Sequence, residues 1–233
     1  MKRYYALTTG ETSADLVIYN DIVTDKWWDD ETSSLDVVNE LMGLPETVTQ
    51  LNVFINSYGG EVAAGLAIYN ALRRHKAHVT TYCDGFACSA ASVVFMAGNE
   101  RVMGEASLLM IHNAWSWGVG NADELRKQAD DLEKISDTAA NAYRAGIKLS
   151  DEELETLLKA ESWISPSEAL EWGFATAIFA EQIPAAANMS ARKMVFDKVL
   201  MREAVEPPAE PLAEERPEDE PKGKTYFNFG GKK

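Results

Sequence analysis

Short apolar runs alternate with amphipathic segments through the first part of the chain. Residues 15–23, 50–56 and 78–83 are rich in Val, Ile, Thr and Tyr, which is typical of strands. Between them, residues 33–42 and 61–74 carry apolar side chains at helical spacing. Strands and helices that alternate at this spacing are expected to form parallel strands with right-handed crossovers. The pattern predicts an α/β fold.

The pattern changes after residue 100. Two more apolar runs, 101–103 and 108–112, are followed by a charged helix over about 121–148 that starts with a capping box, Asn121 to Glu124. A helix of this length is too long to lie wholly on a small domain, so we expect a projecting helix. Its apolar stripe consists of Leu125, Ala129, Leu132, Ile135, Ala139 and Ala142. One subunit is not expected to cover such a stripe, and we therefore predict a homo-oligomer.

Two further capping boxes begin at Ser150 and Ser165, the second with Pro166 at the first helical position. Gly173 is expected to end the second of these helices, and residues 174–179 to form a last strand.

The chain divides into a folded domain, residues 1–184, and an acidic tail, residues 185–233. Five of the eight prolines fall between Pro207 and Pro221, interleaved with glutamates. Such a segment has too little apolar surface to offset its ordering entropy, so the tail is expected to be largely disordered.

Composition excludes several classes of protein. A net charge of −15 argues against nucleic-acid binding, because a phosphate backbone would be repelled. The two cysteines, Cys83 and Cys88, are not spaced as a zinc or disulfide motif, which fits a reducing compartment. The sequence has neither a signal peptide nor an apolar run long enough to span a membrane. We expect a cytoplasmic protein that binds neither membrane nor nucleic acid.

The first chemical candidate is Ser89, which lies where a β-rich run ending near Gly85 turns into a helix of small residues. Free N–H groups and the helix dipole at such a junction favour negative charge, which suits a serine nucleophile and its oxyanion. The simpler interpretation is that Ser89 caps a buried helix.

Three further segments supply candidate partners for Ser89. The double glycine Gly59-Gly60 follows a strand that is expected to neighbour the one ending near Gly85, and it permits close approach of backbone to a ligand. His112 closes a buried-looking strand, and Glu161 precedes a helix start. Each signal alone also fits an ordinary turn, a structural histidine or a surface acid.

The other histidines, His75 and His78, lie in a charged connection and look solvated, which makes them poor general bases. Taken in chain order, the candidates run serine, histidine, acid. An α/β-hydrolase runs serine, acid, histidine around a Gly-x-Ser-x-Gly elbow, and residues 86–91 lack those glycines. The order of the candidate residues and the missing glycines both exclude the α/β-hydrolase fold.

Four segments resemble the signature segments of the Clp protease proteolytic subunit. They are residues 54–60, 85–90, 110–112 and 165–173, in the family's order and at similar spacing. The resemblance covers about residues 15–180. It implies the ClpP/crotonase fold, a spiral of ββα units, with 121–148 as the handle helix through which rings of subunits stack.

The same resemblance implies a site. Ser89 would be the nucleophile, His112 the general base and Glu161 the triad acid. The N–H groups of Gly60 and Ala90 would form the oxyanion hole. No metal or cofactor is implied.

The sequence departs from the family's pattern at Tyr58, where the family has proline, and at Glu161, where the usual acid is aspartate. It is closer to the Clp-like head maturation proteases of tailed bacteriophages. That resemblance implies an ATP-independent serine endopeptidase that processes phage scaffold or capsid proteins, in the host cytoplasm or the assembling prohead. The sequence leaves open whether an unfolding ATPase docks.

Two alternatives share the fold. A crotonase-type acyl-CoA enzyme uses a paired N–H oxyanion hole, but it is expected to lack a coherent serine–histidine pair. A catalytically inactive ClpP-like assembly protein would keep the ring without the chemistry, and the changes at Tyr58 and Glu161 leave this alternative open.

Overall fold

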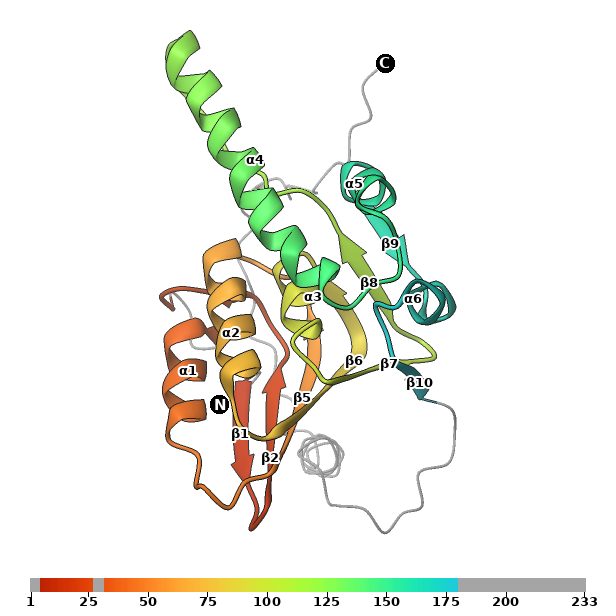
Figure 1. Ribbon diagram of the computed structural model, residues 1–233. Helices are drawn as coiled ribbons and strands as arrows, with labels where there is room; N and C mark the ends of the chain where they lie inside the picture. The colour runs from red at the N-terminus through yellow and green to blue at the C-terminus, as the bar shows by residue number, and fades with distance from the viewer. Residues whose placement is uncertain (1–4, 27–31, 180–233) are drawn as a thin grey trace, which may run out of the picture. The chain divides into compact units, whose positions relative to one another are not determined.

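The computed structural model describes residues 5–26 and 32–179, and within them a mainly parallel sheet carries helices on its faces (Figure 1). Among these residues, one eight-stranded sheet has neighbours in the order β1-β2-β5-β6-β7-β10, with β8 beside β6 and β9 beside β8. The strands are β1 (Tyr5–Thr9), β2 (Ser13–Ile18), β5 (Gln50–Ser57), β6 (His78–Cys88), β7 (Glu100–Gly104), β8 (Leu108–Ile111), β9 (Ser162–Ile164) and β10 (Ala177–Phe179). All pairs are parallel except β1–β2 and β8–β9. The predicted α/β class is confirmed.

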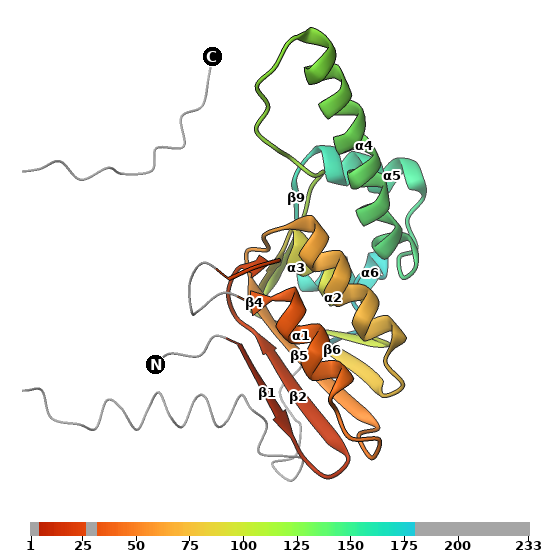
Figure 2. The same cartoon turned by 90° about the vertical axis from the view of Figure 1, so that its left-hand side faces the viewer.

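Helices α1, α2 and α3 lie over one face of the sheet, as Figures 1 and 2 both show. The helices are α1 (Ser34–Met42), α2 (Val62–Arg74), α3 (Ala90–Phe95), α4 (Ala122–Arg144), α5 (Asp151–Lys159) and α6 (Pro166–Trp172). Leu16 and Ile55 from the sheet are fully buried with Ile68 of α2 and Phe95 of α3. Each such side chain contributes about 1.5–3 kcal/mol through burial, so this layer holds the domain together.

The helix starts follow the sequence signals. Ser33 caps α1 by accepting the N–H of Asp36, and the capping boxes at Asn121, Ser150 and Ser165 are all formed. At the end of α6, Gly173 adopts the left-handed conformation, with φ 90°.

Several expectations about the elements were wrong. The strand predicted at 15–23 ends at Ile18, because the chain turns towards the double glycine: Ile22 donates its N–H to the Gly59 carbonyl at 2.8 Å. Residues 22–23 then pair with β4 (Thr32–Ser33) as a separate two-stranded sheet, β3 (Ile22–Val23) with β4. Strand β1 was not predicted. The helix predicted over about 121–148 ends at Arg144, since residues 145–148 turn back and Lys148 donates its N–H to Trp172.

Strand β6 is longer than predicted and divides its pairing between two neighbours. Its first part, Thr80–Cys83, pairs with β7, and its last part, Phe86–Cys88, pairs with β8. The register with β5 shifts between Ile55 and Ser57, where the Asn56 side chain accepts the N–H of Phe86 at 3.0 Å. This irregularity carries the strand past Gly85 to Ser89, instead of ending it at residues 84–85 as the sequence suggested.

Only the C-terminal end of α4 is buried, at Ala140, Ala142 and Tyr143. Figure 2 shows the preceding segment, residues 113–121, running alongside this helix. Gln128 fixes that segment by donating to the Trp117 carbonyl at 2.8 Å.

Within the described residues, no helix combines the length and the apolar character that crossing a bilayer requires. The tail predicted at 185–233, and the domain boundary at 184, lie outside the described residues.

Candidate active site

Ser89 lies directly after β6 and directly before α3, in a backbone conformation that few residues adopt. Its φ is 53° and its ψ −124°, and its side chain makes no capping bond to α3. Such a conformation in a residue other than glycine costs on the order of 1–3 kcal/mol and persists only where the surroundings impose it. One restraint is the Ser89 N–H, which donates to the Met110 carbonyl at 2.8 Å. Ser89 therefore occupies the N-cap position of α3 without capping the helix through its side chain.

The Ser89 hydroxyl instead faces His112. The distance between Ser89 Oγ and His112 Nε2 is 2.7 Å. The two residues meet because β6 and β8 are parallel neighbours, so that the residues following their carboxyl ends lie at the same edge of the sheet. A serine hydroxyl hydrogen-bonded to an imidazole is the arrangement that activates a serine nucleophile.

The double glycine lies against this pair. A side chain on Gly59, whose φ is 102°, would place its Cβ 2.6 Å from the Cys88 carbonyl oxygen and 2.8 Å from Ser89 Cβ. A side chain on Gly60, whose φ is 143°, would place its Cβ 2.1 Å from the Ile22 carbonyl oxygen. Both positions therefore exclude any residue but glycine.

The N–H groups of Gly60 and Ala90 are available to a ligand. Gly60 and Ile22 form a parallel β-bridge, in which Ile22 donates to the Gly59 carbonyl and accepts the N–H of Glu61. In such a bridge the N–H of the middle residue, Gly60, points away from Ile22. Ala90 is the first residue of α3, where an N–H has no partner within the helix. Among the described residues, neither N–H donates to another group.

Glu161 and His112 lie just outside the sheet, at the same end of one strand pair. Strand β9 pairs antiparallel with β8, and the last pair is Ile111 with Ser162. His112 directly follows Ile111, and Glu161 directly precedes Ser162. Glu161 has a φ of 50°, its side chain is exposed, and within the described part of the chain no hydrogen bond joins it to His112.

Comparison with known proteins identifies the family. Residues 10–182 match the family model described as Clp protease. The chain belongs to the Clp protease family. It is also 39% identical over 126 residues to the ATP-dependent Clp protease proteolytic subunit of Deinococcus radiodurans, which is 53% of this chain and 62% of that relative. The chain thus spans less than two thirds of the relative's length.

Other acids of this Clp family chain are engaged elsewhere. Glu168 accepts from the N–H and the hydroxyl of Ser165 at 2.8 and 2.6 Å, and these bonds lower its pKa. Glu153 accepts from Ser150 in the same way, and Glu155 forms an ion pair with Lys159 at 2.6 Å. Glu161 is the acid that adjoins the end of the β8–β9 ladder, next to the pair of Ile111 with Ser162.

The structure also brings together residues that the sequence analysis did not connect with one another. Tyr58, Phe86 and Trp163 form a row of aromatic rings, with centroids 5.4 and 5.7 Å apart, from segments adjoining Gly59, Ser89 and Glu161. Behind Ser89, the buried side chains of Ser92 and Tyr143 are hydrogen-bonded at 2.8 Å. Spacing places Ser92 one helical turn after Ser89, but no sequence signal points to Tyr143.

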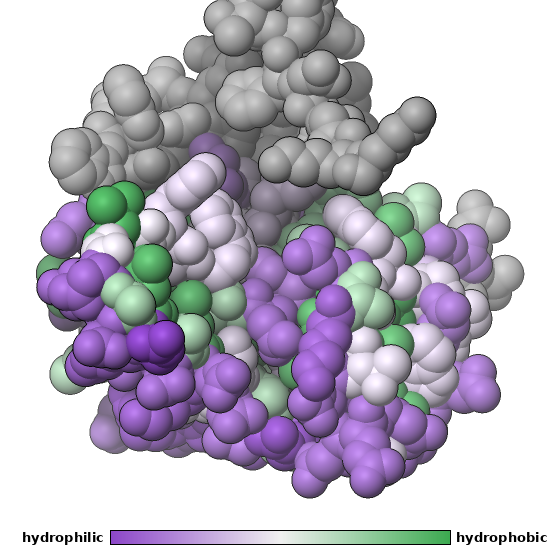
Figure 3. All heavy atoms as spheres, turned by 90° about the horizontal axis from the view of Figure 1, so that it is seen from above, coloured by the Kyte–Doolittle hydropathy of each residue, from purple (hydrophilic) through white to green (hydrophobic). Residues whose placement is uncertain are grey.

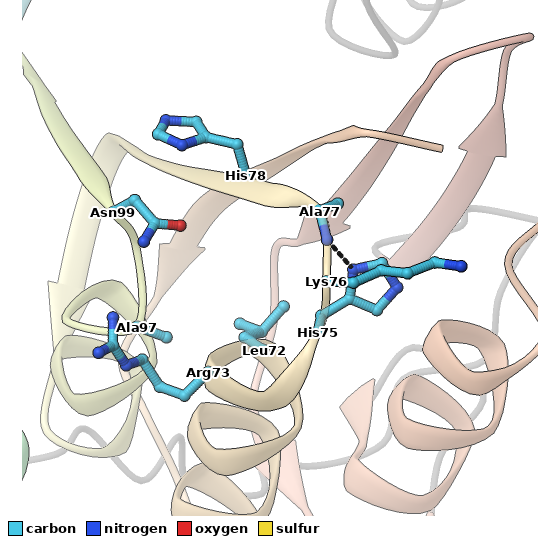
Figure 4. Close-up of a pocket in the computed structure, with 8 residues that line it drawn as sticks. All are labelled: Leu72, Arg73, His75, Lys76, Ala77, His78, Ala97 and Asn99. Atoms are coloured by element: carbon cyan, nitrogen blue, oxygen red, sulfur yellow. Dashed lines mark hydrogen bonds between the residues drawn. The ribbon is translucent and has the colours of Figure 1, made fainter. Parts of the chain in front are cut away.

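A separate cavity of about 340 Å³ lies at the connection between α2 and β6 (Figure 4). Arg73, His75, Lys76 and His78 line it, and His75 Nδ1 accepts the N–H of Ala77 at 3.1 Å. Burial and the neighbouring Lys76 lower the pKa of His75. No serine, threonine or cysteine lines this cavity, so it is not a second nucleophilic site of the family's kind.

Proposed function

We propose that this chain is a serine endopeptidase in which Ser89 is the nucleophile. The observation that carries the proposal is the 2.7 Å contact between Ser89 Oγ and His112 Nε2. In the proposed reaction, Ser89 Oγ attacks the scissile carbonyl while His112 takes its proton, and His112 then protonates the leaving amine. Water releases the acyl group in a second step that uses the same base.

The developing oxyanion is proposed to bind the N–H groups of Gly60 and Ala90. Two backbone donors converging on one oxygen stabilise the tetrahedral intermediate, and removing one donor from such a site costs about 10²–10³ in kcat. Two observations support this role. Gly60 is exposed, and among the described residues neither N–H has a partner.

Glu161 is proposed to complete a Ser-His-Glu triad. For His112 to act as a base, Nε2 must be unprotonated and Nδ1 must carry the hydrogen, which a carboxylate would orient. The end of the β8–β9 ladder supports Glu161 for this role, because Ile111 pairs with Ser162 there and His112 and Glu161 adjoin this pair. The contact requires the Glu161 side chain to turn from solvent towards His112.

The test of the proposed chemistry is labelling by a fluorophosphonate. Wild-type protein and the variant Ser167→Ala, which loses an exposed serine, are expected to be labelled, whereas Ser89→Ala and His112→Ala are not. Absence of labelling in wild type would reject the proposal and favour an inactive assembly protein. A crotonase-type acyl-CoA enzyme, which needs no such serine, would give the same result.

The proposed assembly is a homo-oligomer of rings, with α4 as the projecting handle of a ClpP-type spiral fold. Its support is the exposure of apolar side chains on α4, where Leu125 is 44% and Ile135 40% exposed. Trp117 and Val119 of the adjoining segment are still more exposed. Seen from above, hydrophobic side chains interrupt an otherwise hydrophilic face (Figure 3).

The proposed biological role is narrower: ATP-independent cleavage of phage scaffold or capsid proteins during head maturation, in the host cytoplasm or the prohead. It rests on the resemblance to the head maturation proteases, set beside the departures from the conventional subunit at Tyr58, at Glu161 and in the acidic tail after Pro184. Incubation with co-encoded structural proteins, followed by mass spectrometry of the cut ends, tests it. Cleavage at defined sites without ATP is the expected result, and a requirement for an unfolding ATPase would contradict it.

A further inference from the structure

A buried pair of hydroxyl groups is hydrogen-bonded to the backbone of the nucleophile. Ser92 Oγ is 2.6 Å from the Ser89 carbonyl oxygen and 2.8 Å from the hydroxyl of Tyr143. Ser92 is 1% exposed and Tyr143 is 2% exposed, so water does not compete for these bonds. The chain of contacts joins the last turn of α4 to the backbone of Ser89.

The direction of each hydrogen bond follows from the groups present. The Ser89 carbonyl can only accept, so the Ser92 hydroxyl donates to it. The single hydrogen of that hydroxyl is then used, and Tyr143 must donate to Ser92 Oγ. Burial raises the pKa of Tyr143 to about 12, which keeps its hydroxyl protonated and able to donate at any working pH.

The Ser89 carbonyl and the Ala90 N–H belong to the same peptide group. A trans peptide is planar, and its C=O and N–H point in opposite directions. Whatever holds the Ser89 carbonyl inward therefore holds the Ala90 N–H outward, towards the position of the oxyanion. The N–H groups of Ser92 and Val93 also donate to this carbonyl, at 2.9 and 3.3 Å, but the Ser92 hydroxyl makes the shortest of the three bonds.

We infer that Tyr143 is a positioning residue for the oxyanion hole, acting through Ser92 on the Ser89–Ala90 peptide. Without the Tyr143 hydroxyl, Ser92 Oγ loses its donor and is free to rotate away from the Ser89 carbonyl. The peptide then keeps only its two backbone restraints and samples orientations in which the Ala90 N–H points less directly at the oxyanion. The inference rests on the proposed serine peptidase activity, because it concerns the geometry of that reaction.

The experiment measures inactivation by a fluorophosphonate, whose phosphonyl oxygen occupies the oxyanion hole as the serine is modified. Tyr143→Phe removes only the hydroxyl, and Ser92→Ala removes the middle of the chain. Each is expected to lower the rate constant of inactivation, kinact, roughly three- to tenfold, in keeping with the loss of one buried hydrogen bond. The concentration for half-maximal rate, KI, is expected to stay unchanged, because reversible binding does not depend on the oxyanion contact.

The double variant Tyr143→Phe/Ser92→Ala is expected to lose no more than either single variant, since both changes break one chain. A merely structural role would not produce a selective loss in kinact with this non-additivity. The hydrogen bond between Ser89 and His112 involves neither substituted side chain, so the dependence of kinact on pH is expected to match that of the wild type.

Matched controls separate the inference from general destabilisation. Ser107→Ala removes another buried serine hydroxyl that donates to the carbonyl three residues earlier, Gly104, at 2.8 Å. Tyr69→Phe removes a tyrosine hydroxyl from α2. Both controls are expected to keep wild-type kinact. Melting temperatures of all variants are measured alongside, and if Tyr143→Phe does not fold, Ser92→Ala alone decides.

The inference is overturned if labelled wild type and both single variants share the same kinact, or if the two losses multiply in the double variant. Absence of labelling in wild type itself would instead reject the proposed function. The two failures are therefore distinguishable.

Discussion

His112 and Glu161 each lie one residue beyond Ile111 and Ser162, the last residue pair of the β8–β9 ladder. The backbone of Glu161 is held there in a left-handed conformation, with φ 50°, while its side chain points to solvent. A glutamate has one more methylene than the family's aspartate. We propose that this longer reach brings the carboxylate to His112 from a backbone position at which an aspartate would fall short.

Substitution of Glu161 tests this relationship. Glu161→Ala is expected to lower kcat for a peptide substrate by up to about 10⁴, the effect of a missing triad acid in other serine proteases. Glu161→Asp is expected to fall between wild type and Ala, because the shorter acid does not reach as far. Glu152→Ala, an exposed acid in the first turn of α5, is the control and is expected to retain activity. Wild-type kcat for Glu161→Ala would indicate a dyad or a different acid.

The close packing of Gly60 against the backbone of Ile22 gives a further prediction. Gly60→Ala is expected to lower kcat at least about 10²-fold and to lower the melting temperature, since its Cβ would lie 2.1 Å from the Ile22 carbonyl oxygen. The control is Gly43→Ala, where φ is −83° and the nearest atom to the added Cβ is 3.4 Å away. Differential scanning fluorimetry and peptide hydrolysis measure the two effects. Full activity of Gly60→Ala would show that this loop does not supply an oxyanion donor.

The exposed apolar residues of α4 give a prediction about assembly. Leu125→Glu and Ile135→Glu are expected to reduce the molar mass measured by light scattering at micromolar concentration, because charges are poorly tolerated in a packed interface. Leu35→Glu places the same charge on α1, at a leucine that is 59% exposed, and is expected to leave the mass unchanged. A wild-type protein that is monomeric under these conditions would contradict the proposed oligomer.

The two cysteines give a prediction about pH. Burial raises the pKa of Cys83 to about 12 and that of Cys88 to about 11. A raised pKa keeps a thiol protonated and unreactive below that pKa, so iodoacetamide at pH 8 is expected to alkylate neither cysteine in the folded protein and to leave activity intact. Both are expected to react in guanidinium chloride, which restores ordinary thiol pKa values. Rapid loss of activity at pH 8 in the native state would point to a thiol nucleophile and against Ser89.

Short-range sequence patterns were sufficient to predict the elements that depend on residues close together in the chain. Helix starts at Asn121, Ser150 and Ser165 depend on a side chain bonding to backbone within three residues, and all three formed as predicted. The parallel order of β2, β5 and β6 followed from the alternation of strands and helices, because a crossover helix leaves few other arrangements. Gly173 likewise ended α6 where its freedom to adopt positive φ predicted.

Long-range pairing decided what local patterns could not. Sequence singled out Ser89 and His112 as residue types at strand ends, but their 2.7 Å contact depends on β6 leaving β7 to pair with β8. The extension of β6 beyond Gly85 depends on the Asn56 side chain, which lies 30 positions away from Phe86 in the sequence. Ser92 and Tyr143 are separated by 51 positions, and no periodicity links two residues that meet only when α4 packs behind α3. The sequence by itself determined which residues could carry the chemistry, because residue type and local backbone preference are written in it. The tertiary structure decided which of them meet, because distances between distant segments are set by the packing of the whole sheet.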